Sequence, residues 1–240
     1  MNLLRMTSAK VTTVYYIGAC GFVYALFNWD WSWAFYALIN HIFVMSIFSA
    51  ITHRYYCHQL FKAKEPVMFT LATYSIFYGF PSPVSWSWLH AAHHVYADTD
   101  KDTHIKGWAG VLTSVYRQPS PKFMWATKWF IDGKHRFVHN NALFMLCAWH
   151  AILAFISFDA FIWLGLVNIF TLQLVSNLHR VLSHSGNKTR NIWVFEYLLP
   201  VGGEWMHKVH HDKPNKLFYS DKWYKLDTGA LLIKLVGAAT

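Results

Sequence analysis

Charged side chains are scarce in this chain of 240 residues, because aspartate, glutamate, lysine and arginine together make up only 14% of it. Soluble globular proteins carry about 25% of such residues. Hydrophobic residues, in contrast, make up 55% of the chain. This composition excludes an ordinary water-soluble enzyme and a disordered chain, and it indicates an integral membrane protein.

Cysteine is also rare. The three cysteines, Cys20, Cys57 and Cys147, form no CxxC pair and leave one thiol over from any disulfide count. A disulfide framework and a cysteine-rich zinc site are therefore excluded. A reduced protein that faces the cell interior is favoured.

Four uncharged stretches each approach the roughly 20 residues that a helix needs to cross a bilayer. They are residues 11–27, 33–51, 142–158 and 161–178. Short links join the first to the second and the third to the fourth, so we expect an all-α integral membrane protein with four transmembrane helices in two hairpins. No linker or repeat divides the chain, and residues 1–240 are expected to form a single domain. Residues 52–141 and 179–240 are expected to form a helical cap.

All 21 lysine and arginine residues lie on one side of this topology. Cytoplasmic loops hold the excess of such residues, so we expect a multi-pass protein with its cap and active site on the cytoplasmic face. The net charge of +9 has two alternative explanations. It reflects the topology and attraction to anionic lipid, or it serves to bind an acidic partner or an anionic substrate head group. The basic residues form no recognisable nucleic-acid motif, so nucleic acid is not an expected partner.

Histidine is unusually abundant, with 15 in the chain. Eight lie in three clusters on the predicted cytoplasmic side, namely His53 and His58, then His90, His93 and His94, then His207, His210 and His211. In the second and third clusters, the i, i+3, i+4 spacing puts the outer histidines on one helix face and turns the middle one by about 100°. One turn of helix can thus serve two metal ions. The five-residue spacing of the first cluster predicts that its histidines bind different metals or lie where the helix ends.

The ligand type narrows the choice of metal. Imidazole suits iron, copper, nickel and zinc, whereas structural zinc usually takes only four ligands and often thiolates. We expect two iron ions, with a position left open for O2. Haem would need paired histidines inside the bilayer, where only His41 and His150 lie.

The three clusters and their surroundings resemble the histidine boxes of the membrane fatty acyl desaturases of the stearoyl-coenzyme A desaturase type. The matching family patterns are HRxxxHxxxKA from His53, WxxxHRxHHxxxxTDxDPH from Trp86, and GEGxHNxHH from Gly203. The resemblance is anchored from His53 to about Asp227. Upstream of His53 it depends on hydropathy alone.

By this resemblance the eight clustered histidines are iron ligands, and the family adds a ninth from an NxxxH pattern at the end of the fourth span. Here no asparagine stands four residues before either His179 or His184. We prefer His179, because it directly ends the apolar stretch, over His184. Asn177 is a candidate for holding a metal-bound water.

Three acidic residues near the boxes are candidates for accepting the free ring N–H of a ligand and fixing its tautomer. They are Glu204, Asp98 and Asp100.

A second departure from the family pattern concerns the substrate. The coenzyme A type has an aspartate before the second box and an arginine within it, where this chain has Leu89 and Ala91. An acyl-CoA, with delta-9 as the family's position, therefore competes with an acyl chain on a carrier protein or a glycerolipid.

The resemblance implies an oxygen-dependent desaturase that introduces a cis double bond into an acyl substrate. The chain has no flavin, dinucleotide or cytochrome motif, so an external electron donor is implied, such as cytochrome b5 or ferredoxin with its reductase. A hydroxylase, ketolase or related oxygenase of the same membrane superfamily is the enzymic alternative. A membrane metal transporter is the alternative outside the enzymes, although its ligands should lie near mid-bilayer.

Overall fold

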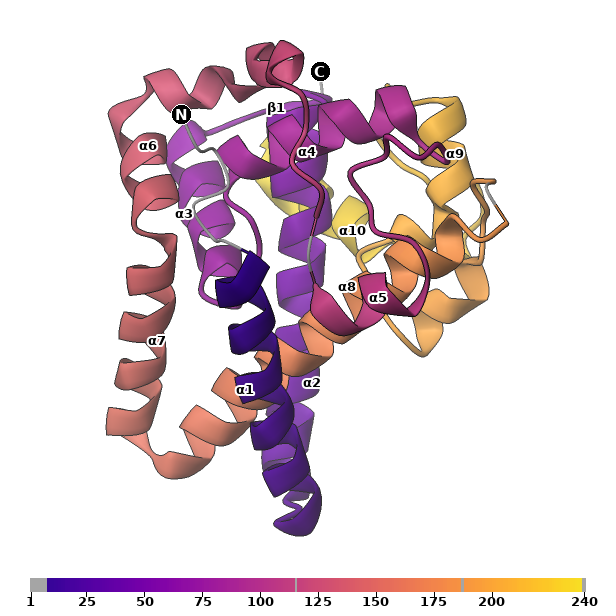
Figure 1. Cartoon of the computed structure of the whole chain (residues 1–240). Coiled ribbons are helices and arrows are strands. Elements are labelled where there is room, and N and C mark those ends of the chain that lie inside the picture. Colours follow the sequence, from indigo (N-terminus) through magenta and orange to yellow (C-terminus); the bar gives the residue numbers. More distant parts are fainter. Residues whose placement is uncertain (1–7, 115, 187, 239–240) are drawn as a thin grey trace.

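The computed structural model describes residues 8–114, 116–186 and 188–238, which are mostly helical (Figure 1). The helices are α1 (Ser8–Phe27), α2 (Trp31–Ile47), η1 (Phe48–Cys57), α3 (Glu65–Ile76), α4 (Pro83–Tyr96), α5 (Gly107–Thr113), η2 (Pro121–Ile131), α6 (Gly133–Asn140), α7 (Ala142–Ile156), η3 (Ala160–Val167), α8 (Asn168–Ser183), η4 (Trp193–Tyr197), η5 (Glu204–Met206), α9 (His207–Asp212) and α10 (Thr228–Val236). Of these, η1 and η3 are π-helices, and η2, η4 and η5 are 3₁₀-helices. Two short strands, β1 (Lys62–Ala63) and β2 (Gly237–Ala238), pair in antiparallel fashion.

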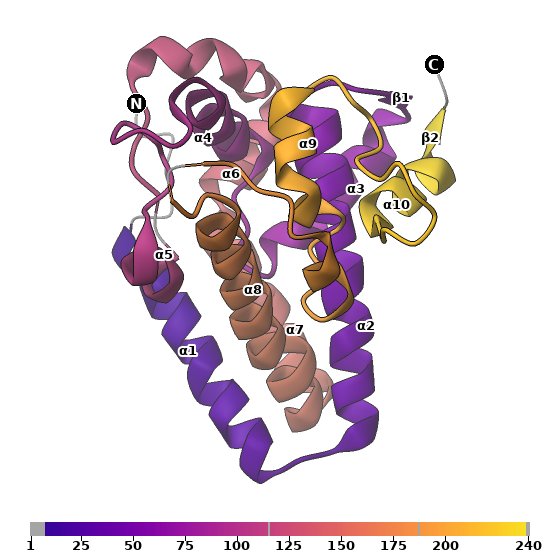
Figure 2. The same ribbon diagram turned by 90° about the vertical axis from the view of Figure 1, so that its right-hand side faces the viewer.

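The first two membrane helices form a hairpin, as the sequence predicts. The side chain of Asp30 begins α2, since it accepts hydrogen bonds from the backbone N–H groups of Ser32 and Trp33 at 2.8 and 3.0 Å. Figure 2 shows the α1–α2 link at the far end of the molecule from α4 and α9.

The second of these helices is longer than expected. Because α2 continues into η1 without a break, one rod runs over 27 residues, Trp31–Cys57, where the sequence predicts a span of 33–51. The extension carries the first histidine cluster on the end of a membrane helix.

The second hairpin differs more from the prediction. Its last rod, Ala160–Ser183, joins η3 to α8 and extends beyond the predicted 161–178. Its first arm, α7, has only 15 residues and follows α6 at a bend of 70°. Among the residues that the structure describes, three helices are therefore long and apolar enough to cross a membrane, and a fourth span requires α6 and α7 together.

The two hairpins approach closely at small residues of α1. A Cβ atom on Gly21 would lie 2.3 Å from the Cβ atom of Leu166, and one on Gly18 would lie 3.0 Å from the Leu166 carbonyl oxygen. Glycine thus lets α1 pack against η3 and α8, as is common between membrane helices.

The remaining helices cover one end of these rods (Figures 1 and 2). A buried core that includes Met45, Phe48, Trp86, Leu172 and Trp205 joins α2, α4, α8 and η5 there. This core brings the ends of α2, α4 and α8 together, and all three histidine clusters lie at that junction.

Candidate metal centre

The first histidine cluster lies on a π-helix. In η1 the backbone N–H of His58 donates to the carbonyl oxygen of His53 at 3.2 Å, so the backbone makes one turn in five residues. Both rings therefore lie on the same side. The expectation that these histidines bind different metals assumed the spacing of an α-helix, whereas here both rings belong to one group of converging nitrogens. His58 does lie where the helix ends.

Five ring nitrogens converge beside this turn, and together we call them the five-histidine site. The residues are His53, His58, His90, His94 and His210. The Nε2 atom of His90 lies 2.8, 2.7 and 2.8 Å from those of His53, His58 and His94. The Nε2 atom of His210 lies 3.2 Å from that of His53 and 2.8 Å from that of His94.

Four further rings converge next to it, and we call them the four-histidine site. They are His93, His184, His207 and His211. The Nε2 atom of His207 lies 2.8 Å from that of His184 and 3.1 Å from that of His211. The Nε2 atom of His211 is also 3.1 Å from that of His93.

The second and third clusters divide between the two sites as their spacing predicts. On α4, His90 and His94 belong to the five-histidine site and His93 to the four-histidine site. On α9 the outer pair, His207 and His211, belongs to the four-histidine site and His210 to the other. Each of these short helices therefore serves both sites.

The opposite nitrogens of several rings have partners that fix the tautomer. The Nδ1 atoms of His53, His93 and His184 lie 3.0, 2.8 and 3.0 Å from carboxylate oxygens of Glu204, Asp102 and Asp98, respectively. A carboxylate only accepts hydrogen bonds, so each of these rings carries its proton on Nδ1 and turns a lone pair on Nε2 inward. The tautomers follow from these partners.

These convergent lone pairs fit a bound cation. Burial lowers the pKa of both His58 and His94 to about 2, with help from neighbouring charges, so both rings are neutral at physiological pH, as metal binding requires. Ligand nitrogens at right angles on one ion lie about 3.0 Å apart when each metal–nitrogen bond is about 2.1 Å. The observed separations of 2.7 to 3.2 Å agree with this spacing.

The predicted acidic residues differ in their roles. Glu204 contacts His53 and also accepts a hydrogen bond from Ser49. Burial alone would raise the pKa of Glu204, but His53, Arg54 and Ser49 outweigh it and hold the pKa below its usual range. Glu204 is therefore an ionised acceptor.

The two predicted aspartates separate. Asp98 reaches His184, and its backbone has a φ of 65°, a strained conformation for a residue with a side chain. Asp100 is exposed, and its backbone carbonyl accepts a hydrogen bond from Arg117. The acceptor for His93 is Asp102, which the sequence reasoning missed although it belongs to the same short run of acidic residues.

Tyr219 was also missed. Its hydroxyl lies 3.1 Å from the Nδ1 atom of His210, so its oxygen can accept that ring's N–H. Nothing in the local sequence around Tyr219 marks this contact, although the two residues are only nine apart in the chain.

The structure places His184, and not the preferred His179, in the four-histidine site. The Nε2 atom of His179 lies 2.8 Å from the Glu204 carbonyl oxygen, to which only a protonated nitrogen can donate. Asn177 is buried away from both sites, where its side-chain amide donates to the Val111 carbonyl and to Ser114. Neither His179 nor Asn177 is among the converging ligand atoms of the described residues.

A cavity of about 50 Å³ borders both sites. Apolar and aromatic side chains, including Met45, Phe48, Trp86, Tyr116 and Val201, form one part of its wall. Polar side chains form the other part, namely rings from both sites, including His53, His90, His93 and His207, together with His179, Arg180 and Glu204. The site thus presents its ligand rings to an apolar space between the membrane helices and the cap.

No protein-family model matches the chain. The curated proteins that resemble it include the hex-5-enoyl-(acyl-carrier protein) acetylenase of Moorena producens, 24% identical over 75% of this chain and 66% of its own length. Acyl-CoA desaturase 1 of Saccharomyces cerevisiae is 24% identical over 83% of this chain and 45% of its own length. The delta-9 desaturase-like 5 protein of Arabidopsis thaliana is 22% identical over 90% of this chain and 78% of its own length.

The chain thus spans less than two thirds of the length of the first two of these relatives. All three are aligned over three quarters or more of this chain. At 22% to 24% identity, these relatives support a place for the chain in the membrane fatty acyl desaturase family.

Proposed function

We propose that the chain is an oxygen-dependent fatty acyl desaturase that introduces a cis double bond into an acyl chain. One observation carries the proposal: five and four imidazole nitrogens converge on two neighbouring points beside an apolar cavity. A metal transporter would place such ligands within its spans. Here they lie at the ends of the membrane helices and on the short helices α4 and α9.

In this proposal each site holds one iron ion, and His184 is the ninth ligand in place of His179. The two ions would supply the activation of O2 and the removal of hydrogen from unactivated methylene groups, for which side chains have no chemistry. The donor sets fit this role, because imidazole suits iron and such ions accept five or six ligands.

Side chains of the protein orient the ligand rings and exclude water from the cavity. Glu204, Asp98 and Asp102 hold three of the ligand rings in one orientation, since each accepts a hydrogen bond from an Nδ1–H group. The apolar wall of the cavity, with Phe48 and Trp86, excludes water and would hold two adjacent methylene groups of the substrate against the ligand rings.

The acyl carrier and the electron donor belong to the same proposal. The acyl chain enters attached to coenzyme A, a carrier protein or a glycerolipid, and two electrons come from a separate donor such as cytochrome b5 or ferredoxin. The net charge of +9 favours an acidic donor. We place the catalytic face on the cytoplasmic side of the membrane, since lysine and arginine gather there.

The test is a fatty acid profile of a desaturase-deficient host that expresses the chain together with an electron donor. A matched host expresses the His93→Ala, His94→Ala double variant, which removes one ligand from each site. We expect a new unsaturated ester only from the unaltered chain, and its position identifies the specificity. A hydroxylated product would contradict desaturation, and an identical profile in both hosts with equal iron content would contradict the metal assignment.

A further inference from the structure

We propose that Asp227 is a positioning residue for the five-histidine site and acts on it through Arg54 and Glu204. The inference rests on the proposed assignment of iron to that site. By this inference, metal binding at the five-histidine site also requires the segment around residues 217–230, which contributes no ligand itself.

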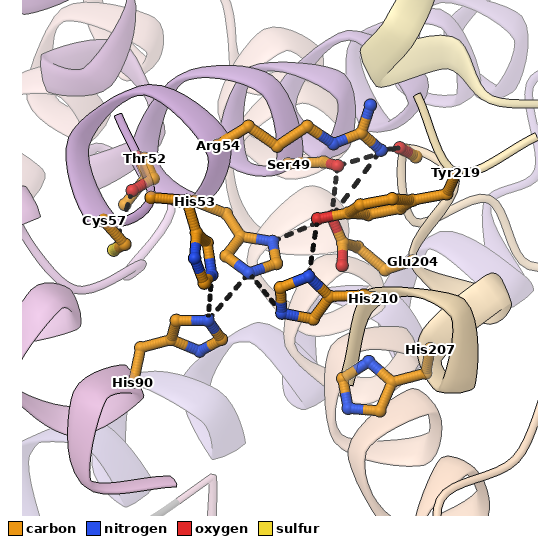
Figure 3. A network of polar contacts seen from close by, with 12 residues as sticks. Ser49, Thr52, His53, Arg54, Cys57, His90, Glu204, His207, His210 and Tyr219 are labelled. Atoms are coloured by element: carbon orange, nitrogen blue, oxygen red, sulfur yellow. Dashed lines mark hydrogen bonds and ion pairs between the residues drawn. The ribbon is translucent and has the colours of Figure 1, made fainter. Parts of the chain in front are cut away.

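Arg54 is fully buried beside the five-histidine site and has two carboxylates within reach. Its Nη2 atom donates to Asp227 Oδ1 at 2.9 Å and to the Gly202 carbonyl oxygen at 3.1 Å. The same atom lies 3.9 Å from Glu204 Oε1. Figure 3 shows Arg54 on the side of Glu204 and Tyr219 away from the ligand rings.

The distances show which carboxylate pairs with the cation. Glu204 Oε1 lies 3.0 Å from the Nδ1 atom of His53, nearer than it lies to Arg54. A buried guanidinium is costly without a direct partner. If Asp227 lost its charge, Arg54 would have Glu204 as its remaining buried carboxylate among these contacts. Glu204 would then be drawn from His53, and the His53 ring would lose the acceptor that orients it.

Asp227 is itself held in place by the backbone around it. Its Oδ2 atom accepts from the Tyr219 N–H at 3.1 Å, and its Oδ1 atom accepts from the Ala230 N–H at 2.8 Å, which begins α10. Gly203 has a φ of +92°, and a Cβ atom there would lie 2.4 Å from Asp227 Oδ1. Glycine at 203 therefore lets Asp227 pack directly against the residue that precedes Glu204.

The same segment reaches a second ligand. The Arg54 guanidinium lies 3.9 Å over the ring of Tyr219, whose hydroxyl contacts the Nδ1 atom of His210. His53 and His210 both belong to the five-histidine site. The acceptors of the four-histidine site, Asp98 and Asp102, come from a different part of the chain. Loss of Asp227 should therefore weaken only one of the two sites.

The test compares Asp227→Asn with Asp221→Asn in the purified full chain. Asp221 is exposed and lies in the same segment, where its carboxylate pairs with Lys225, so it is the matched control. The measurements are iron per chain and the Mössbauer spectrum, which distinguishes two iron environments. In Asp227→Asn we expect metal binding at the five-histidine site to weaken about 10- to 100-fold, so that one of the two iron signals is lost.

A second pair of variants separates positioning from folding. Tyr219→Phe keeps the ring under Arg54 and removes only the hydroxyl at His210, so it should weaken the same iron signal. Arg54→Gln combined with Asp227→Asn removes the competing cation, so it should restore part of the binding. Full occupancy of both sites in Asp227→Asn, or equal loss of both iron signals, would overturn the inference. An unaltered chain that binds no iron would instead refute the proposed function itself.

Discussion

The rings of His53 and His58 approach the same atom, because their Nε2 atoms lie 2.8 and 2.7 Å from the Nε2 atom of His90. The two residues are separated by one turn of π-helix, in which the N–H of His58 bonds to the carbonyl oxygen of His53. An α-helix would turn the second ring about 140° away from the first. The wider turn therefore brings two imidazole nitrogens to one site at the end of this helix.

The choice between His184 and His179 gives the first prediction. We expect His184→Ala to remove the iron signal of the four-histidine site, since its Nε2 atom lies 2.8 Å from that of His207. His179→Ala should leave both iron signals in place, because that ring donates to the Glu204 carbonyl. The iron content of the two purified variants shows which of the two histidines is the ligand. Loss of iron only in His179→Ala would contradict our assignment.

The division of the clusters between two sites gives the second prediction. His94 and His211 are both half-buried, and their rings lie 4.7 Å apart by centroid, yet they belong to different sites. We expect His94→Ala and His211→Ala each to abolish activity and each to remove a different iron signal, while the membrane helices remain inserted. Mössbauer spectra of the two variants test this. The same signal missing from both would show that the two rings share an ion.

A buried carboxyl outside both sites predicts a pH dependence of stability. Burial raises the pKa of Glu196 to about 8, although its Oε1 atom accepts from the Val201 N–H at 2.9 Å. In the unfolded chain a glutamate loses its proton near pH 4.3. Between these values the folded chain keeps a proton that the unfolded chain has lost, so stability falls as pH rises toward about 8 and is level above it.

The variant Glu196→Gln should abolish this slope, because an amide does not ionise. Thermal unfolding in detergent from about pH 5 to pH 8 measures it, and the melting temperature of the unaltered chain should fall more across this range than that of the variant. Parallel curves would show that the side chain of Glu196 is charged in the folded chain.

The close approach of the hairpins gives the last prediction. Gly21→Val would place a branched side chain where a Cβ atom alone lies 2.3 Å from Leu166 Cβ. We expect a loss of about 1 to 3 kcal/mol in stability, as is typical of overpacking. Gly133→Ala is the control, since a Cβ atom there has no neighbour within 4 Å. An equal melting temperature for Gly21→Val and the unaltered chain would refute tight packing here.

Much of the site could be predicted because helical spacing fixes the direction of side chains. The i, i+3, i+4 pattern on α4 and α9 separates His93 from His90 and His94, and His210 from its neighbours, without any knowledge of the fold. The first hairpin follows equally directly from two uncharged stretches of sufficient length, whereas a span at α7 requires the bent pair of α6 and α7. These features depend on residues close together in the chain.

The errors arise where the structure depends on hydrogen-bond register or on distant segments. An apolar stretch marks where lipid ends and not where a helix ends, so the continuation of α8 to Ser183 could not be read from hydropathy, and His179 was preferred over His184. The π-helix of η1 depends on which carbonyl accepts each N–H. Asp227 contacts Arg54, which lies 173 residues earlier in the chain, and Tyr219 contacts His210 nine residues earlier. Neither spacing corresponds to a local pattern that would predict the contact.

Helix α9 donates ligands to both sites, and it follows all of the membrane helices in the chain. Neither site is complete on a ribosome until this helix has been translated and the earlier helices have been inserted. Under the proposed assignment, iron binds only after α9 has been made, and it stabilises the fold by mass action because the unfolded chain has no such site.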